Sequence, residues 1–148
     1  MSFASDCDAL PELVDASKPG LQALNAQDLA HVSKRPTTTL TTSVDIDTAY
    51  RASQPNAARW DYGVAQKQNG KELIHWIEVH PAGGANSISQ MQSKLRWLRG
   101  WLHGKPLAAY PRVVVWVASG KSAFNARDPK IRTLALAGLQ FVGGHYAI

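Results

Sequence analysis

The sequence predicts an α/β domain with a mixed central sheet, because three signals follow one another along the chain. Asn69-Gly70 separates two segments of alternating character, residues 60–67 and 71–80, and this setting is the strongest short-range signal for a β-hairpin. Apolar residues then recur at helical spacing over residues 87–102. Residues 113–118 (VVVWVA) form a short apolar run, which is typical of a strand covered on both faces. We therefore expect a β-hairpin, a crossover helix and a parallel strand in one sheet.

The length of the chain, 148 residues, fits one domain of ordinary size. Short helices and loops are expected over residues 1–43, where a Pro-Gly pair interrupts the chain. Within this part, residues 36–43 (PTTTLTTS) suit a loop or an edge strand. We expect a single domain, residues 1–148, in which this helical and loop extension precedes an α/β core over residues 44–148.

The ends of three helices are predicted from capping residues. Ser43 is expected to cap a helix over residues 45–52, and Ser87 is expected to cap the amphipathic helix. A last helix is expected to begin at Asp128, which precedes a proline suited to the first helical turn. Glycines at 143–144 are expected to end it.

Positive charge is concentrated in the second half of a chain whose formal net charge is +5. Residues 88–132 contain nine lysines and arginines but only one acidic residue, whereas residues 1–30 are mainly acidic. A basic half of this kind could face a polyanion such as nucleic acid. The alternative is a solvated surface with a mild bias in charge.

Several classes of protein are excluded or disfavoured by composition. Cys7 is the only cysteine, so an intramolecular disulfide and a four-cysteine zinc site are both excluded. No apolar run approaches the roughly 18 residues of a membrane span, and the N-terminus lacks the pattern of a secretory signal. We expect a cytoplasmic protein without a membrane partner.

The predicted hairpin places two acidic side chains opposite each other. Side chains two residues apart in a strand share a face, so Glu78 and His80 point the same way as Trp76. Counting back from the two-residue turn sets Asp61 directly opposite Glu78, with Cβ atoms roughly 4.5–5.5 Å apart. The same register sets Gly63 against Trp76, and this match of a small residue with a large one supports it.

Two opposed carboxylates repel each other, so a compensating group is expected. A divalent cation is the natural candidate, because hard cations bind carboxylate oxygens and water. Asp61, Glu78 and the backbone carbonyl of Val79 would then form half of its coordination shell. The alternative is that these side chains line a solvated face, where His80 or Arg59 neutralises Glu78.

The order of these elements resembles the PD-(D/E)xK superfamily of nucleases and resolvases. A helix is followed by a hairpin with an aspartate on its first strand and Glu-x-basic on its second, then by a helix and a strand. The resemblance covers roughly residues 44–118. It implies a restriction endonuclease-like fold, hydrolysis of nucleic-acid phosphodiesters, and a magnesium or manganese cofactor. This sequence departs from the motif at Trp60, where the family has proline.

Carried over residue by residue, the resemblance implies roles for five side chains. Asp61 and Glu78 would bind the metal. His80 occupies the position of the family's lysine, which positions or activates the attacking water. Lys94 could supply the missing fixed charge from the following helix. Gln90, on the same helix, is the other residue that would assist, in contact with nucleic acid.

Arg96, Arg99 and Lys121 are the remaining candidates for contacts with a nucleic-acid backbone, most simply that of DNA. Lys121 follows the apolar strand and is expected at the sheet edge where the Glu78 strand ends. Three hypotheses stay open: a metal-dependent nuclease, a catalytically inactive domain of the same fold that binds nucleic acid or a protein, and an accessory factor of unrelated α/β fold. Many members of the superfamily dimerise, so a homodimer is compatible with the resemblance.

Overall fold

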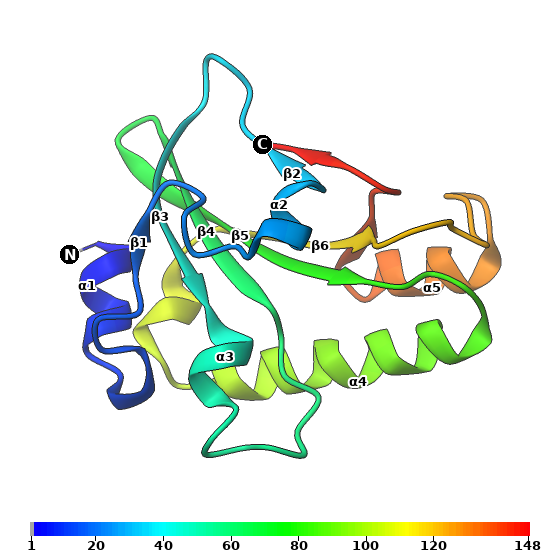
Figure 1. Ribbon diagram of the computed structural model, residues 1–148, viewed down its shortest axis with the longest axis horizontal. Helices are drawn as coiled ribbons and strands as arrows, with labels where there is room; N and C mark the ends of the chain where they lie inside the picture. Colours follow the sequence, from blue (N-terminus) through cyan, green and yellow to red (C-terminus); the bar gives the residue numbers. More distant parts are fainter. Residues whose placement is uncertain (1) are drawn as a thin grey trace.

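A mixed sheet of six strands forms the centre of the computed structural model, which describes residues 2–148 (Figure 1). Its strand order is β1-β3-β4-β5-β6-β7, and a separate two-stranded sheet pairs β2 with β8. The strands are β1 (Lys18–Pro19), β2 (Val32–Ser33), β3 (Thr39–Asp45), β4 (Tyr62–Gln68), β5 (Lys71–His80), β6 (Arg112–Ala118), β7 (Leu139–Phe141) and β8 (Tyr146–Ala147).

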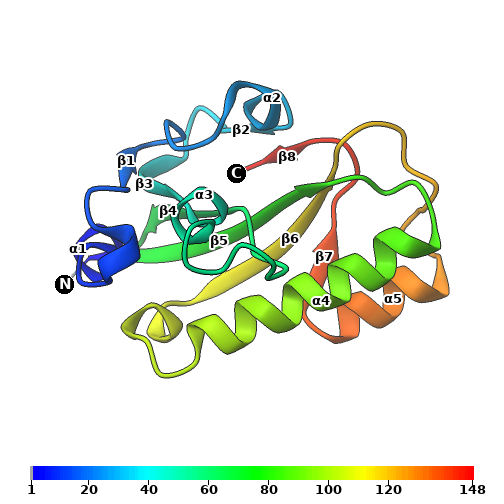
Figure 2. The ribbon, with the colours of Figure 1, turned by 60° about the horizontal axis from the view of Figure 1, so that its bottom comes forward.

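Helices cover one face of the sheet, and the small β2–β8 sheet lies over the other face together with α2 (Figure 2). Within residues 2–148, no helix has both the length and the apolar character needed to cross a membrane. The helices are α1 (Phe3–Asp8), α2 (Ala26–Leu29), α3 (Ile46–Tyr50), α4 (Ala85–Leu102) and α5 (Pro129–Leu136), with short 3-10 helices η1 (Pro11–Leu13) and η2 (Pro106–Ala109).

The hairpin forms at the predicted turn and in the predicted register. Asn69 and Gly70 both have positive φ, 52° and 75°, as a two-residue hairpin turn of the type I′ class requires. β4 and β5 are antiparallel, and Gly63 lies opposite Trp76. α4 then connects β5 to β6, which pairs parallel to β5. The predicted mixed sheet with a hairpin, a crossover helix and a parallel strand is confirmed.

Both faces of the sheet are buried. Successive side chains of each central strand point to opposite faces, so each strand contributes to two buried clusters. Trp76 and Trp116 are fully buried in the cluster beneath the helices. Ile77, Val115 and Val117 belong to a second buried cluster on the opposite face. The continuous apolar run of β6 therefore reflects burial on both sides, as predicted.

Two predicted helix caps are wrong. Asp45, rather than Ser43, caps α3, because its carboxylate accepts a hydrogen bond from the N–H of Thr48. Ser43 instead lies in β3, so the boundary drawn between residues 43 and 44 cuts through a sheet strand. α4 begins before Ser87, whose hydroxyl accepts a hydrogen bond from the N–H of Gly83.

The last helix is shorter than predicted. α5 begins at Pro129 after its cap Asp128, as expected, but ends at Leu136 rather than near residues 143–144. Gly138 has φ +93°, a conformation that favours glycine and ends the helix. Beyond it, Leu139 pairs with β6 as part of β7. Apolar residues recur in the sequence beyond the end of α5 because the buried strand β7 follows the helix directly.

Replacing Gly63 by alanine is expected to destabilise the protein by about 1–3 kcal/mol, the usual cost of overpacking a core. A Cβ at this position would lie 2.6 Å from Cζ3 of Trp76 and 3.1 Å from Cζ of Phe3. Gly83→Ala is the matched control, because its Cβ would meet nothing within 4 Å. Urea unfolding followed by tryptophan fluorescence compares the two variants, and equal losses would contradict the expected clash.

Candidate active site

Two carboxylates meet where β4 begins and β5 approaches its end. The N–H of Asp61, one residue before β4, donates to Oε1 of Glu78 at 3.1 Å. In return, the N–H of Val79 donates to Oδ2 of Asp61 at 3.0 Å. Each carboxylate is thus held by a backbone N–H of the other strand, and the two acidic side chains lie together as the register indicated.

The position of Asp61 is set by local backbone as well as by the sheet. The paired residues of β4 and β5 end at Tyr62, so the carboxylate of Asp61 takes the ladder position beside Val79. The carbonyl of Asp61 also accepts a hydrogen bond from the N–H of Ile46, in the first turn of α3, at 2.9 Å. The end of one strand and the start of a helix therefore hold Asp61 in place.

α4 supplies the cation that the carboxylates need. Nζ of Lys94 lies 3.0 Å from Oε2 of Glu78 and donates to the carbonyl oxygen of Arg59 at 2.8 Å. Arg59 itself forms an ion pair with Asp47 at 3.0 Å. The alternative in which Arg59 neutralises Glu78 is therefore wrong, because the guanidinium of Arg59 turns toward α3.

His80 lies between Glu78 and α4. Its Nδ1 is 3.6 Å from Oε2 of Glu78, and its Nε2 is 2.7 Å from Oε1 of Gln90. Because an amide oxygen only accepts, Nε2 carries the hydrogen, and a neutral ring then directs the lone pair of Nδ1 toward Glu78. The structure thus brings together all five side chains that the resemblance singled out: Asp61, Glu78, His80, Gln90 and Lys94.

Burial shifts the titration of this group. Glu78 is 1% exposed, and burial together with the charge of Asp61 raises its pKa well above the usual value, while Lys94 lowers it. Burial raises the pKa of Asp61 to about 7 against the lowering effects of the Val79 N–H and Lys94. Burial lowers the pKa of His80. Both carboxylates therefore hold a proton more readily than they would in water.

The oxygen donors at this position fit a hard divalent cation. Within residues 2–148, no three His, Cys, Asp or Glu side chains form a group that could hold a metal ion. The donors here are instead the two carboxylates and a backbone carbonyl. The N–H of Val79 faces Asp61, and a strand residue directs its carbonyl to the same side as its N–H. Asp61, Glu78 and the carbonyl of Val79 offer oxygens of the kind that such a cation prefers, and Oε1 and Oε2 of Glu78 already contact the N–H of Asp61 and Nζ of Lys94.

The other candidate residues are arranged less tightly around the carboxylates. Arg96 and Arg99 are exposed and line a hollow between α4 and α5, and Arg99 donates to the carbonyl oxygen of Ala137. The structure does not bring these two arginines to the carboxylates. Lys121 is exposed in the loop after β6. That loop starts beside the end of β5, since the N–H of Ser119 donates to the carbonyl oxygen of His80 at 3.2 Å.

Trp116 contributes to the site in a way that sequence reasoning missed. It pairs with Glu78 across β5 and β6, and its indole N–H donates to the carbonyl oxygen of His80 at 2.9 Å. Within the apolar run of β6, Trp116 is the one side chain with a polar group, its indole N–H, and this feature of the sequence could have indicated it. Trp97 and Trp101 of α4 stack on each other with ring centroids 5.8 Å apart, and Trp101 is buried.

Comparison of this chain with protein-family models, with curated proteins and with solved structures finds no match.

Proposed function

We propose that the protein is a metal-dependent nuclease of the PD-(D/E)xK type that hydrolyses phosphodiesters of nucleic acid, most simply DNA. The observation that carries the proposal is the pair of facing carboxylates, Asp61 and Glu78, with Lys94 at 3.0 Å from Glu78. The order of a hairpin, a crossover helix and a parallel strand supports the restriction endonuclease-like assignment.

Asp61, Glu78 and the carbonyl of Val79 would hold magnesium or manganese. When bound, the metal would stabilise negative charge on the phosphate and lower the pKa of a coordinated water. Lys94 replaces the family's lysine from a different element, because its ammonium reaches the same glutamate from α4. His80, whose pKa is lowered by burial, is neutral near pH 7 and can accept a proton through Nδ1.

Contacts with nucleic acid would come from the exposed residues around this group. Gln90 is exposed on the first half of α4 beside His80, and Lys121 is exposed in the loop next to the end of β5. Arg96 and Arg99 lie further along α4 and would reach the backbone only at a distance from the reacting phosphate.

A second function is favoured by the burial of the ion pair. Glu78 is 1% exposed and Lys94 already contacts its Oε2, which suits a structural ion pair as well as a metal ligand. In that case the protein would be a catalytically inactive domain of the same fold that binds nucleic acid or a protein partner.

Incubation with plasmid DNA, single-stranded DNA and RNA tests the proposal. We expect cleavage of at least one substrate with magnesium or manganese. We expect none with a chelator, because it removes the cation that the two carboxylates would hold. Retarded but intact DNA, with a retardation that weakens as salt rises, would instead support the inactive binding domain. If no substrate is cleaved or retarded, the nuclease and the nucleic-acid-binding domain are both ruled out, and of the two functions only a domain that binds a protein partner is left.

A further inference from the structure

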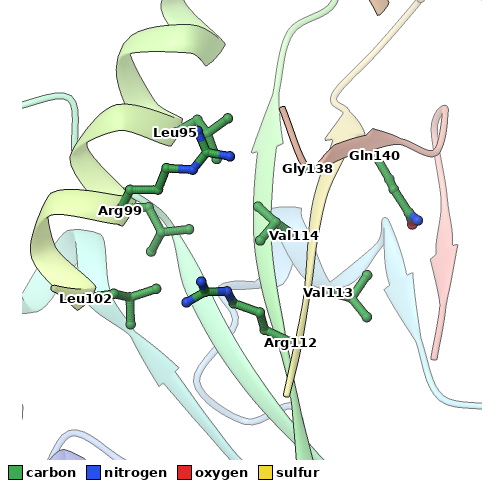
Figure 3. A pocket seen from close by; sticks show the side chains of 9 residues that line it. Leu95, Arg99, Leu102, Arg112, Val113, Val114, Gly138 and Gln140 are labelled. Carbon is green, nitrogen blue, oxygen red and sulfur yellow. The ribbon is translucent and has the colours of Figure 1, made fainter. Parts of the chain in front are cut away.

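A pocket of about 370 Å³ opens between α4, β6 and β7, away from the carboxylates (Figure 3). Arg112, at its edge, pairs with Ile74 of β5, whereas Trp116 pairs with Glu78. Four residues of strand separate these two pairs, which corresponds to roughly 13 Å. The pocket therefore lies at the opposite end of β6 from the candidate active site.

Two arginines converge on this pocket from different elements. Arg99 extends from α4 toward the strands, and Arg112 extends from the start of β6 back toward α4 (Figure 3). Arg99 is held by the carbonyl oxygen of Ala137 at the end of α5. Gly138 lies beside it, since a Cβ there would be in ordinary contact with Nη2 of Arg99, 3.5 Å away.

The two positive charges have no anionic partner in the protein. Among residues 2–148, no carboxylate lies within 4.0 Å of a nitrogen of Arg99 or Arg112. Like charges brought to one pocket repel each other, and an anion held between them removes that repulsion. The guanidinium group is also the side chain best shaped to hold a phosphate or carboxylate through paired N–H donors.

The remaining walls of the pocket are mainly apolar. Leu98, Leu102 and Val114 line it beside the two arginines. A pocket with a few polar groups on apolar walls is typical of sites for small organic molecules, and its volume lies within their usual range of about 300–1,000 Å³. The occupant therefore needs an anionic head for the arginines and an apolar body for these walls.

We propose that this pocket binds a small phosphate monoester with an apolar or aromatic body. A phosphate monoester carries close to two negative charges above about pH 7, which matches the two arginines, whereas a carboxylate carries one. The proposal does not depend on cleavage, because neither arginine belongs to the carboxylate group; Arg99 alone is shared with the residues that would contact a nucleic-acid backbone.

Isothermal titration calorimetry with phenyl phosphate at pH 8 tests the proposal. We expect binding that weakens about tenfold in Arg112→Gln, since one charge-assisted contact is lost. Arg99→Lys is also expected to weaken binding, because the charge remains while the paired donors are lost. Arg132→Gln, which removes an exposed charge from α5, is the matched control and is expected to bind as the unaltered protein does.

Further titrations separate the sources of binding energy and test whether the pocket is distinct from the carboxylate group. Inorganic phosphate and benzoate are each expected to bind more weakly than phenyl phosphate, since one lacks the apolar body and the other a charge. Glu78→Gln is expected to bind phenyl phosphate as the unaltered protein does, because Glu78 does not line the pocket. Failure of the nuclease proposal and failure of this proposal can therefore be told apart. The absence of binding at millimolar phenyl phosphate, or an equal loss in Arg112→Gln and Arg132→Gln, would overturn the proposal. Displacement of bound phenyl phosphate by a DNA oligonucleotide that lacks any terminal phosphate would do so too, by assigning the pocket to a nucleic-acid backbone.

Discussion

Replacing Glu78 by glutamine is expected to reduce metal-dependent cleavage by about a hundredfold to a thousandfold, as for the loss of one group that stabilises charge in a transition state. Glutamine keeps the shape of the side chain, and its amide oxygen can still accept the hydrogen bond from Asp61 N–H, which Oε1 accepts in the unaltered protein. What it removes is the negative charge that a metal ion and Lys94 both need. Cleavage of plasmid DNA at saturating magnesium measures the loss.

Two control measurements show whether the loss of cleavage is specific to the charge of Glu78. Asp15→Asn makes the same chemical change at an exposed position and is expected to cleave as the unaltered protein does. DNA retardation by Glu78→Gln is expected to persist, because the basic residues that would contact the backbone are unchanged. Cleavage by Glu78→Gln at the rate of the Asp15→Asn control would rule out the metal-binding role of this glutamate.

Replacing Lys94 by methionine is expected to destabilise the protein by about 3 kcal/mol at pH 8, which is typical of removing one partner of a buried ion pair. Nζ of Lys94 is the cation at 3.0 Å from Glu78, and the two side chains are only 17% and 1% exposed. Without it, an ionised Glu78 has His80, a group whose pKa is lowered by burial, as its nearest basic neighbour.

The same loss is expected to be smaller at pH 5. The pKa of Glu78 in the folded protein is raised above that of the unfolded chain. Between these two pKa values the folded state binds more protons than the unfolded state, so the stability of the protein falls as pH rises. Removing Lys94 raises this pKa further and makes the fall steeper. At pH 5 a protonated Glu78 no longer needs the cation, so most of the destabilisation disappears.

Urea unfolding of the unaltered protein, Lys94→Met and Lys130→Met at both pH values measures this effect. Lys130 is exposed on α5, so its replacement is expected to change stability little at either pH. Because the lowered pKa values of His75 and His80 act in the opposite direction on the unaltered protein, the comparison uses differences between proteins at each pH. An equal destabilisation at pH 5 and pH 8 would contradict the expected dependence of this ion pair on the protonation of Glu78.

Strong local signals made the central elements predictable. The conformation of Asn69-Gly70 needs only the two turn residues, and once the turn is placed, every pair of the hairpin follows by counting. β6 was predictable because a short apolar run matches a strand buried on both faces. Helix ends were harder, since Ser43 and Asp45 compete for the same cap and the pairing of β3 with β4 decides between them.

Short strands of the N-terminal part were not predictable from sequence for a related reason. β1 and β2 contain two residues each and exist only because distant strands, β3 and β8, lie beside them. The end of α5 likewise depends on β7 joining the sheet next to β6. No local pattern of residues encodes a partner that is brought close only when the chain folds.

For the candidate site, the sequence by itself determined that Asp61 and Glu78 would face each other, because turn geometry and strand alternation act over a few residues. Only the tertiary structure decided that Lys94 reaches Glu78 while Arg99 lines the pocket that Arg112 also lines. These two residues are five apart on α4 and therefore project in different directions, and the packing of the helix on the sheet selects which one meets the carboxylates. Rotation of a helix about its axis is set by long-range contacts, which a one-dimensional pattern does not contain.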